Sequence, residues 1–184
     1  MPIIAREPNI YPDDFLEPTY QRDSVARGLL LYTRPRQEKA LARDLLRLCL
    51  PFYLPLVPQR SQVRGRVVTS HIPLFSGYMF ACVRDEQRLD LLRTNRLSQV
   101  IAVDDEQQLA CELRHVEFLI ASEKPVTIER RLEAGTRVRV KTGPLKGLEG
   151  VVACRRGKER LILAVTLLQQ GASIEIDDFQ VEPT

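Results

Sequence analysis

The side chains best suited to nucleophilic or metal chemistry in this chain of 184 residues are Cys49, Cys82, Cys111, Cys154, His71 and His115. The spacing of the cysteines fits neither a zinc site nor the disulfide framework of a small secreted domain. A cysteine hydrolase would need a base beside its nucleophile, and no motif joins Cys82 to His71. We therefore expect reduced core thiols, no metal, no cofactor and no enzymatic activity.

Positive charge is the second chemical feature of the sequence. The chain carries a net charge of +3, but residues 129–160 hold ten bases and four acids, whereas residues 161–184 hold four acids and no base. A shorter basic run, Arg60, Arg64 and Arg66, contains no acid among its charges. Such charge suits a partner that presents phosphates or a charged protein face, and a solvated surface or charged loop gives the same pattern.

Composition limits the kind of fold that can carry these groups. Only 6% of the residues are aromatic and none is Trp, so the core must be built mainly from Leu and Val. No apolar run approaches the roughly 18 residues that span a bilayer, and the first residues lack the apolar stretch of a secretory signal. We expect a soluble, cytoplasmic monomer without a membrane partner. Residues 1–27 contain four prolines and predict a flexible leader, whose Tyr11, Phe15 and Tyr20 could lie on another surface.

Residues 28–122 predict an α+β domain. Leu41, Leu45 and Leu48 recur at helical spacing, and Pro51 ends that helix. Two further helices are expected, one starting at Asp85 with Leu89 and Leu92 inward, and one entered at residues 104–106. Strands are expected at 29–33, 52–57, 62–69, 78–83 and 100–103, the second of them at an edge because it contains Pro55. This order predicts a mixed, mostly antiparallel sheet with packed helices.

A second, smaller domain is expected after a linker at residues 123–132. Residues 133–184 contain short apolar or alternating runs at 138–140, 151–153, 161–167, 173–176 and 179–181. Five short strands with tight turns predict a small barrel, because closure removes exposed strand edges.

Two motifs in this order resemble one known family. The run from Gly135 to Val152, with turn residues Gly143, Pro144 and Gly147, resembles the KOW motif of NusG-type transcription factors and several ribosomal proteins. The run Leu30 to Arg34, a charged helix, a basic hairpin and then Pro73 to Phe80 are together similar to the NusG N-terminal domain. The resemblance covers residues 29–182 and implies a transcription elongation or antitermination factor of the NusG/RfaH type, with an SH3-like KOW barrel.

The resemblance implies that the N-terminal domain grips a coiled-coil hairpin on the clamp of RNA polymerase. The residues that match this apolar pocket are Leu30, Tyr32, Phe75, Tyr78 and Phe80. The alternative is that these side chains are simply part of the hydrophobic core. A second polymerase contact matches Gln87, Arg88 and Asp90. A surface that faces the displaced, non-template DNA strand matches Arg34, Arg93 and Arg96, and Arg64 and Arg66 of the basic hairpin are further candidates for nucleic-acid contact.

In the KOW domain, the resemblance implies contact with a ribosomal protein or with termination factor Rho through Leu167, Leu168, Gly171 and Ile174. The sequence departs from the general pattern in both domains, since Leu168 and Leu145 of the KOW domain each stand where Phe is usual and Ser76 of the N-terminal domain replaces a Pro. These departures favour a specialised, operon-directed paralogue. The alternative is a KOW-type RNA-binding or ribosome-associated protein, which would bind through Arg137, Arg139, Lys141 and Lys146.

Overall fold

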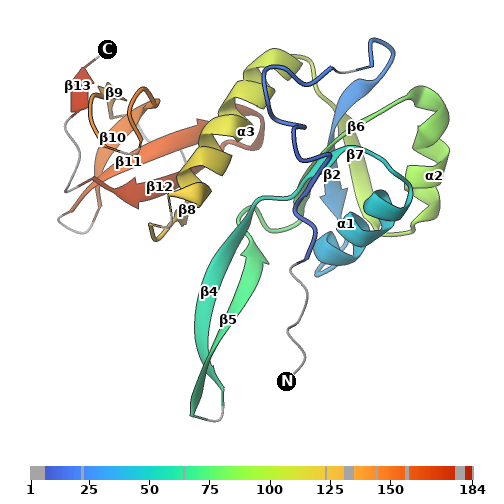
Figure 1. Ribbon diagram of the computed structural model, residues 1–184, viewed down its shortest axis with the longest axis horizontal. Helices are drawn as coiled ribbons and strands as arrows, with labels where there is room; N and C mark the ends of the chain where they lie inside the picture. The colour runs from blue at the N-terminus through green and yellow to red at the C-terminus, as the bar shows by residue number, and fades with distance from the viewer. Residues whose placement is uncertain are drawn as a thin grey trace. The chain divides into compact units, whose positions relative to one another are not determined.

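The computed structural model in Figure 1 describes residues 7–21, 23–63, 65–122, 124–130, 135–143, 145–155, 158–176 and 181–183. The chain forms two compact units, Met1–Glu106 and Gln107–Thr184. Within the described ranges, no helix is long and apolar enough to cross a membrane.

The first unit is built on a five-stranded sheet in the order β1-β3-β6-β2-β7. Its strands are β1 (Ile10–Tyr11), β2 (Arg27–Thr33), β3 (Phe52–Tyr53), β6 (Tyr78–Val83) and β7 (Leu97–Ala102), and every pairing is antiparallel. The helices of this unit are α1 (Glu38–Arg47) and α2 (Arg88–Arg93), the latter preceded by a 3-10 turn, η1 (Asp85–Gln87). The predicted α+β class and the largely antiparallel sheet are confirmed.

The core of the first unit joins the sheet to α1. Leu41, Ala42 and Leu45 form one buried stripe of α1, as the helical spacing predicts, and pack with Leu29 and Leu31 of β2. Leu48, expected on the same stripe, is 41% exposed because α1 ends at Arg47. Residues of the opposite sheet face, such as Leu30 and Phe80, are also buried. Both faces of the central strands are therefore covered.

The leader, expected to be flexible, is docked on this unit. Ile10 and Tyr11 pair with Tyr53 and Phe52, and Leu54 donates a backbone hydrogen bond to Asn9 at 2.6 Å. Glu7 also forms an ion pair with Arg43 of α1 at 2.6 Å. The expectation rested on proline content and overlooked that β3 offers unpaired backbone groups to a short extended segment. Strand β3 consequently lies inside the sheet, between β1 and β6. The edge position that Pro55 had suggested for this strand was wrong.

A long hairpin replaces the separate strand expected at residues 62–69. Strand β4 (Leu56–Val63) pairs along its whole length with β5 (Arg66–Pro73), and these two strands form a sheet of their own. Gly65 has φ +75°, a backbone angle that glycine adopts without steric cost, and it lies at the turn. The ribbon projects from the rest of the first unit, as Figure 1 shows for β4 and β5.

The second unit combines helix α3 (Glu106–Ala121), most of which lies within it, with a six-stranded antiparallel sheet in the order β13-β9-β10-β11-β12-β8. The strands are β8 (Thr127–Glu129), β9 (Thr136–Val140), β10 (Glu149–Arg155), β11 (Lys158–Val165), β12 (Gln170–Glu175) and β13 (Val181–Pro183). Among the described residues, no pairing joins the outer strands β13 and β8, so the sheet order is open. Strand β8 lies in the segment expected to be a linker, and Phe179, expected in the last strand, lies outside the described residues.

The core of the first unit gives a matched test on α1. Replacing Leu45 with Ala is expected to lower the free energy of unfolding by about 2–5 kcal/mol, because it removes buried methyl groups and leaves a cavity. Its neighbour Leu46 is 40% exposed, and Leu46→Ala should change this free energy by at most about 0.5 kcal/mol. Urea unfolding of both variants measures the difference, and equal losses would contradict the assigned helix orientation.

Candidate functional site

Two tyrosines form an accessible aromatic pair on the central strands of the first unit. Tyr32 of β2 lies directly opposite Tyr78 of β6, and their ring centroids are 5.1 Å apart with 42° between the ring planes. Tyr32 is 40% exposed and Tyr78 is half-buried. Tyrosine rings carry a large apolar area and a polar hydroxyl, a combination that favours protein interfaces.

The loop before β6 holds this pair in place. The N–H of Gly77 donates a 2.9 Å hydrogen bond to Oε1 of Glu38, and the Gly77 carbonyl accepts one of 2.8 Å from the N–H of Thr33. Gly77 has φ +83°, and a Cβ at this position would lie 3.0 Å from the Tyr32 ring. Only glycine therefore lets the Tyr32 ring approach the backbone so closely.

Glu38 is a functional residue that no pattern in the sequence indicated. Its side chain lies in the first turn of α1 and is only 6% exposed, yet its contact is 39 positions away along the chain. No local spacing connects a helix carboxylate with a loop so distant in sequence. The sequence indicated a turn glycine at Gly77, but it did not indicate that Glu38 accepts the hydrogen bond from the Gly77 N–H.

The other three residues expected in the apolar pocket are part of the interior. Phe75 is fully buried, and Leu30 and Phe80 are each 2% exposed. Leu30 lies opposite Phe80 in the strand register, and the Phe80 ring stacks on Tyr53 with centroids 6.5 Å apart. In this structure these three side chains are buried and do not reach the surface.

The start of α2 carries the second group of expected contact residues. Arg88 and Asp90 are exposed, and the Gln87 side chain accepts a 3.0 Å hydrogen bond from the N–H of Arg84. Leu89 and Leu92 were expected to point inward, but they are 63% and 46% exposed. Leu91 is the buried residue instead, because α2 has only six residues and presents one side chain to the sheet.

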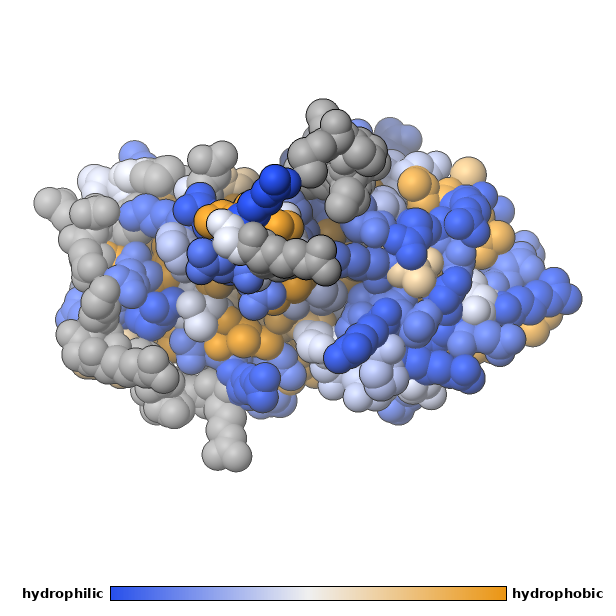
Figure 2. Space-filling model, turned by 90° about the horizontal axis from the view of Figure 1, so that it is seen from below, coloured by the Kyte–Doolittle hydropathy of each residue, from blue (hydrophilic) through white to orange (hydrophobic). Residues whose placement is uncertain are grey.

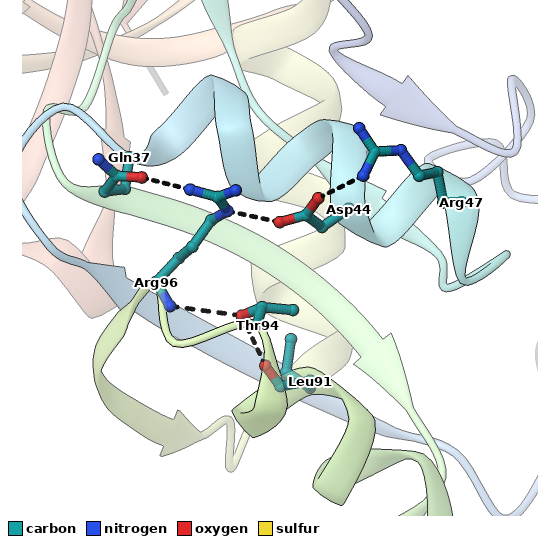
Figure 3. A network of polar contacts seen from close by, with 6 residues as sticks. All are labelled: Gln37, Asp44, Arg47, Leu91, Thr94 and Arg96. Atoms are coloured by element: carbon teal, nitrogen blue, oxygen red, sulfur yellow. Dashed lines mark hydrogen bonds and ion pairs between the residues drawn. The ribbon is translucent and has the colours of Figure 1, made fainter.

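The arginines expected to contact nucleic acid differ in their availability. Arg34 is exposed, and the exposed Arg93 pairs with Asp90 at 3.1 Å. Arg96 bridges Asp44 and Gln37 of the α1 region, and its own N–H approaches Thr94, as Figure 3 shows. Arg96 thus joins two parts of the fold. Arg66 is exposed on the hairpin, and Arg64 lies outside the described residues.

The loop expected to bind a partner in the second unit is the 3-10 turn η2 (Thr166–Leu168). Leu167 is 39% exposed and Leu168 is half-buried, whereas Gly171 and Ile174 are buried. The carboxylate of Glu112 on α3 accepts hydrogen bonds from the Thr166 N–H at 2.9 Å and from its hydroxyl at 2.5 Å. Helix α3 therefore fixes the turn that exposes Leu167.

Some of the bases in the basic stretch of this unit have acidic partners. Arg139 pairs with Glu149, Lys141 lies 3.1 Å from Glu182, and Arg160 lies 3.5 Å from Glu175. The hydrogen bond from Arg139 lowers the pKa of the Glu149 carboxyl, and the same bond raises the pKa of Arg139. Arg137 and Lys146 are exposed. Three of the ten bases of residues 129–160 therefore have acidic partners among the described residues.

The large exposed apolar side chains of the described residues include Val67, Val68 and Ile72 on β5 and Leu89 and Leu92 on α2. On the face in Figure 2, hydrophilic residues dominate and hydrophobic ones gather only in small separate patches. The paired rings of Tyr32 and Tyr78 offer one place for a partner contact. Within the described residues, no group of His, Cys, Asp and Glu side chains is arranged to hold a metal ion.

The Glu38–Gly77 hydrogen bond gives a testable prediction. Glu38→Ala is expected to lower the free energy of unfolding by about 1–3 kcal/mol, since it leaves a buried N–H without an acceptor. Glu38→Gln keeps a side-chain oxygen at this place and should retain more of the stability. Thermal unfolding of both variants checks this order, and equal melting temperatures would contradict the proposed role of the bond.

His115 gives a prediction about pH. Burial lowers the pKa of its imidazole, and the neighbouring Arg114 acts in the same direction. Because the unfolded chain then binds a proton more readily, stability should fall as the pH decreases from about 6.5 through the lower folded pKa. Melting temperatures at pH 7.5 and pH 5.5 should therefore differ more in the wild type than in His115→Asn, and an equal difference would contradict this coupling.

Comparison with known proteins identifies the family. The family model described as transcription termination factor nusG matches residues 29–131, which include the tyrosine pair, Glu38 and the start of α2. A search of curated proteins found no match. Factors of this family act in transcription elongation and termination together with RNA polymerase, and the family is not one of enzymes. Since the match covers more than half of its residues, the chain belongs to the NusG family of transcription factors.

Proposed function

We propose that this protein is a bacterial elongation and antitermination factor that binds the RNA polymerase clamp through the surface formed by Tyr32 and Tyr78. The observation that carries the proposal is the accessible pair of rings, 5.1 Å apart, in the segment that matches the family. Burying one such side chain in an interface contributes about 1.5–3 kcal/mol, so two can anchor a complex.

The proposed mechanism is a shift of populations and needs no catalytic group. A factor that binds the elongating state of the polymerase more tightly than the paused state favours elongation by the ratio of the two affinities. Contact at two places strengthens this preference for the elongating state. The factor can bind with both contacts only when the two sites on the polymerase are correctly placed relative to each other. The second contact is assigned to Gln87, Arg88 and Asp90, and the exposed Leu89 between them adds apolar area.

The displaced non-template DNA strand is the proposed nucleic-acid partner of the first unit. Arg34 is the best candidate for this contact, because its side chain is exposed and no acidic partner is found for it among the described residues. Arg93 can contribute if a phosphate replaces Asp90. Arg96 is assigned a structural role in place of DNA contact, since Asp44 and Gln37 already bind its guanidinium.

The second unit is proposed to be a KOW domain that recruits a further partner, a ribosomal protein or Rho. We place the N-terminal domain at residues 28–122 and the KOW domain at 133–184. Gly143 and Gly147, at φ +85° and +89°, support the KOW turn. Leu167 and Leu168 are the proposed contact residues, supported from behind by Gly171 and Ile174.

The departures at Ser76, Leu145 and Leu168 support a specialised paralogue that acts on selected operons. The alternative function, RNA binding by the KOW domain, receives less support from the charges. Arg139 and Lys141, two of its four expected contact residues, form ion pairs with Glu149 and Glu182.

A pull-down with purified RNA polymerase tests the clamp contact. Tyr78→Ala is expected to weaken binding roughly tenfold to a hundredfold, because it removes one of the two accessible rings. Phe118→Ala is the matched control, since Phe118 is an aromatic residue on α3 with 47% exposure and should leave binding unchanged. Circular dichroism checks that both variants are folded, and equal binding by folded Tyr78→Ala would remove the assignment.

A further inference from the structure

The β4–β5 hairpin is exposed over most of its length in the part of the chain that the structure describes. Val57 is 8% exposed, but the described side chains from Pro58 to Gln62 and from Arg66 to Thr69 are exposed on both faces of the ribbon. Beyond Val57 the two strands form six further residue pairs, from Pro58–His71 to Val63–Arg66. At about 3.3 Å per residue the arm is roughly 20 Å long. An isolated two-stranded ribbon is only marginally stable, so this arm is unusual as a purely structural element.

The charge of the arm suits a polyanion. Residues 56–73 contain three arginines and one histidine, and neither Asp nor Glu. Arg60 and Arg66 are exposed, and no ion pair is found for either within the described part of the chain. An arm with uncompensated positive charge and long reach is attracted to the phosphates of nucleic acid.

The side-chain types distinguish between the possible nucleic acids. Residues 56–73 include no Phe, Tyr or Trp, and proteins that bind single strands typically stack the bases on such rings. A two-stranded ribbon fits the major groove of B-form DNA, which is about 12 Å wide. The major groove of an RNA duplex is too narrow for side chains to read. The arm is therefore best suited to duplex DNA.

One face of the arm carries groups that can read base edges. Residues directly opposite each other in an antiparallel pair share a face, so Arg60 lies beside Thr69, and Gln62 lies beside Val67. Arg can bind guanine, Gln can bind adenine, Thr can bind either, and an apolar side chain such as Val67, 72% exposed, can contact the thymine methyl group. Among the described residues, Arg60, Gln62 and Thr69 have no side-chain hydrogen-bond partner.

The opposite face is less available for recognition. The hydroxyl of Ser61 donates to the Val68 carbonyl at 3.5 Å, and that of Ser70 donates to the Gln59 carbonyl at 3.4 Å. These hydroxyls are held by the ribbon's own backbone. The two faces therefore differ in the polar groups that they offer to a ligand.

We propose that the β4–β5 arm enters the major groove of duplex DNA, with Arg60, Gln62, Val67 and Thr69 reading base edges and Arg66 contacting a phosphate. This function goes beyond polymerase binding and does not depend on the tyrosine pair. It would give the factor a sequence preference of its own for the duplex beside its site of action.

The test is a selection of duplexes from a randomised DNA pool with the full chain, followed by fluorescence anisotropy on the selected duplex. Arg60→Ala is expected to weaken binding to this duplex roughly tenfold, and Gln62→Ala should reduce the preference for the selected sequence over a scrambled one. Arg66→Ala should weaken both duplexes alike and lower the slope of log affinity against log salt by about 1. Gln59→Ala, on the opposite face, is the matched control and should bind as the wild type does.

Two results would overturn the proposal. One is wild-type affinity of folded Arg60→Ala for the selected duplex, and the other is equal or tighter binding of the matching single strand or RNA duplex. Tyr78→Ala should retain duplex binding, and Arg60→Ala should retain polymerase binding. Failure of the arm can thus be told apart from failure of the clamp contact.

Discussion

The antiparallel register between β2 and β6 is the constraint on which the functional surface depends. It places Tyr32 opposite Tyr78, and the same register places Leu30 opposite Phe80 in the interior. A shift of β2 by one residue would turn its side chains to the other face, so Tyr32 would point to the face that now buries Leu31 against α1. The Glu38–Gly77 hydrogen bond fixes this register at the end of β6 where the tyrosines lie. The buried carboxylate and the positive φ of Gly77 are therefore part of the binding surface, although neither needs to touch a partner.

Much of the first unit follows from local patterns in the sequence. The leucine spacing placed α1 correctly, and the apolar runs placed β2 and β6, because burial of one face imposes these periods on a helix or a strand. The failures occur where distant segments decide the outcome. Leu89 and Leu92 have the spacing of an inward face, but a helix of six residues is oriented by the sheet beneath it. Docking of Ile10 and Tyr11 depends on a free strand that lies 41 to 43 positions away along the chain.

The candidate site shows the same division. The aromatic residues could be found from the sequence, but which of them reach the surface depends on what covers each face of the sheet. Phe75, Tyr78 and Phe80 look alike in the sequence, and only Tyr78 remains accessible. Charge was misleading for a related reason. Arg96 and Arg139 look like free cations in the sequence, yet Asp44 and Glu149 meet them in space. Arg60 and Arg66 lie on the exposed hairpin, and within the described ranges no acidic side chain pairs with either of them.

The docked leader also affects how these molecules behave toward one another in solution. Strand edges with free N–H and C=O groups invite pairing between molecules, and proteins avoid aggregation by covering them. Here Ile10 and Tyr11 occupy the outer side of β3 with the chain's own backbone. Proteolytic removal of this short segment would expose the unpaired backbone groups of β3. The N-terminal segment therefore also helps to keep the protein soluble at high concentration, because it covers a strand edge that could pair with other molecules.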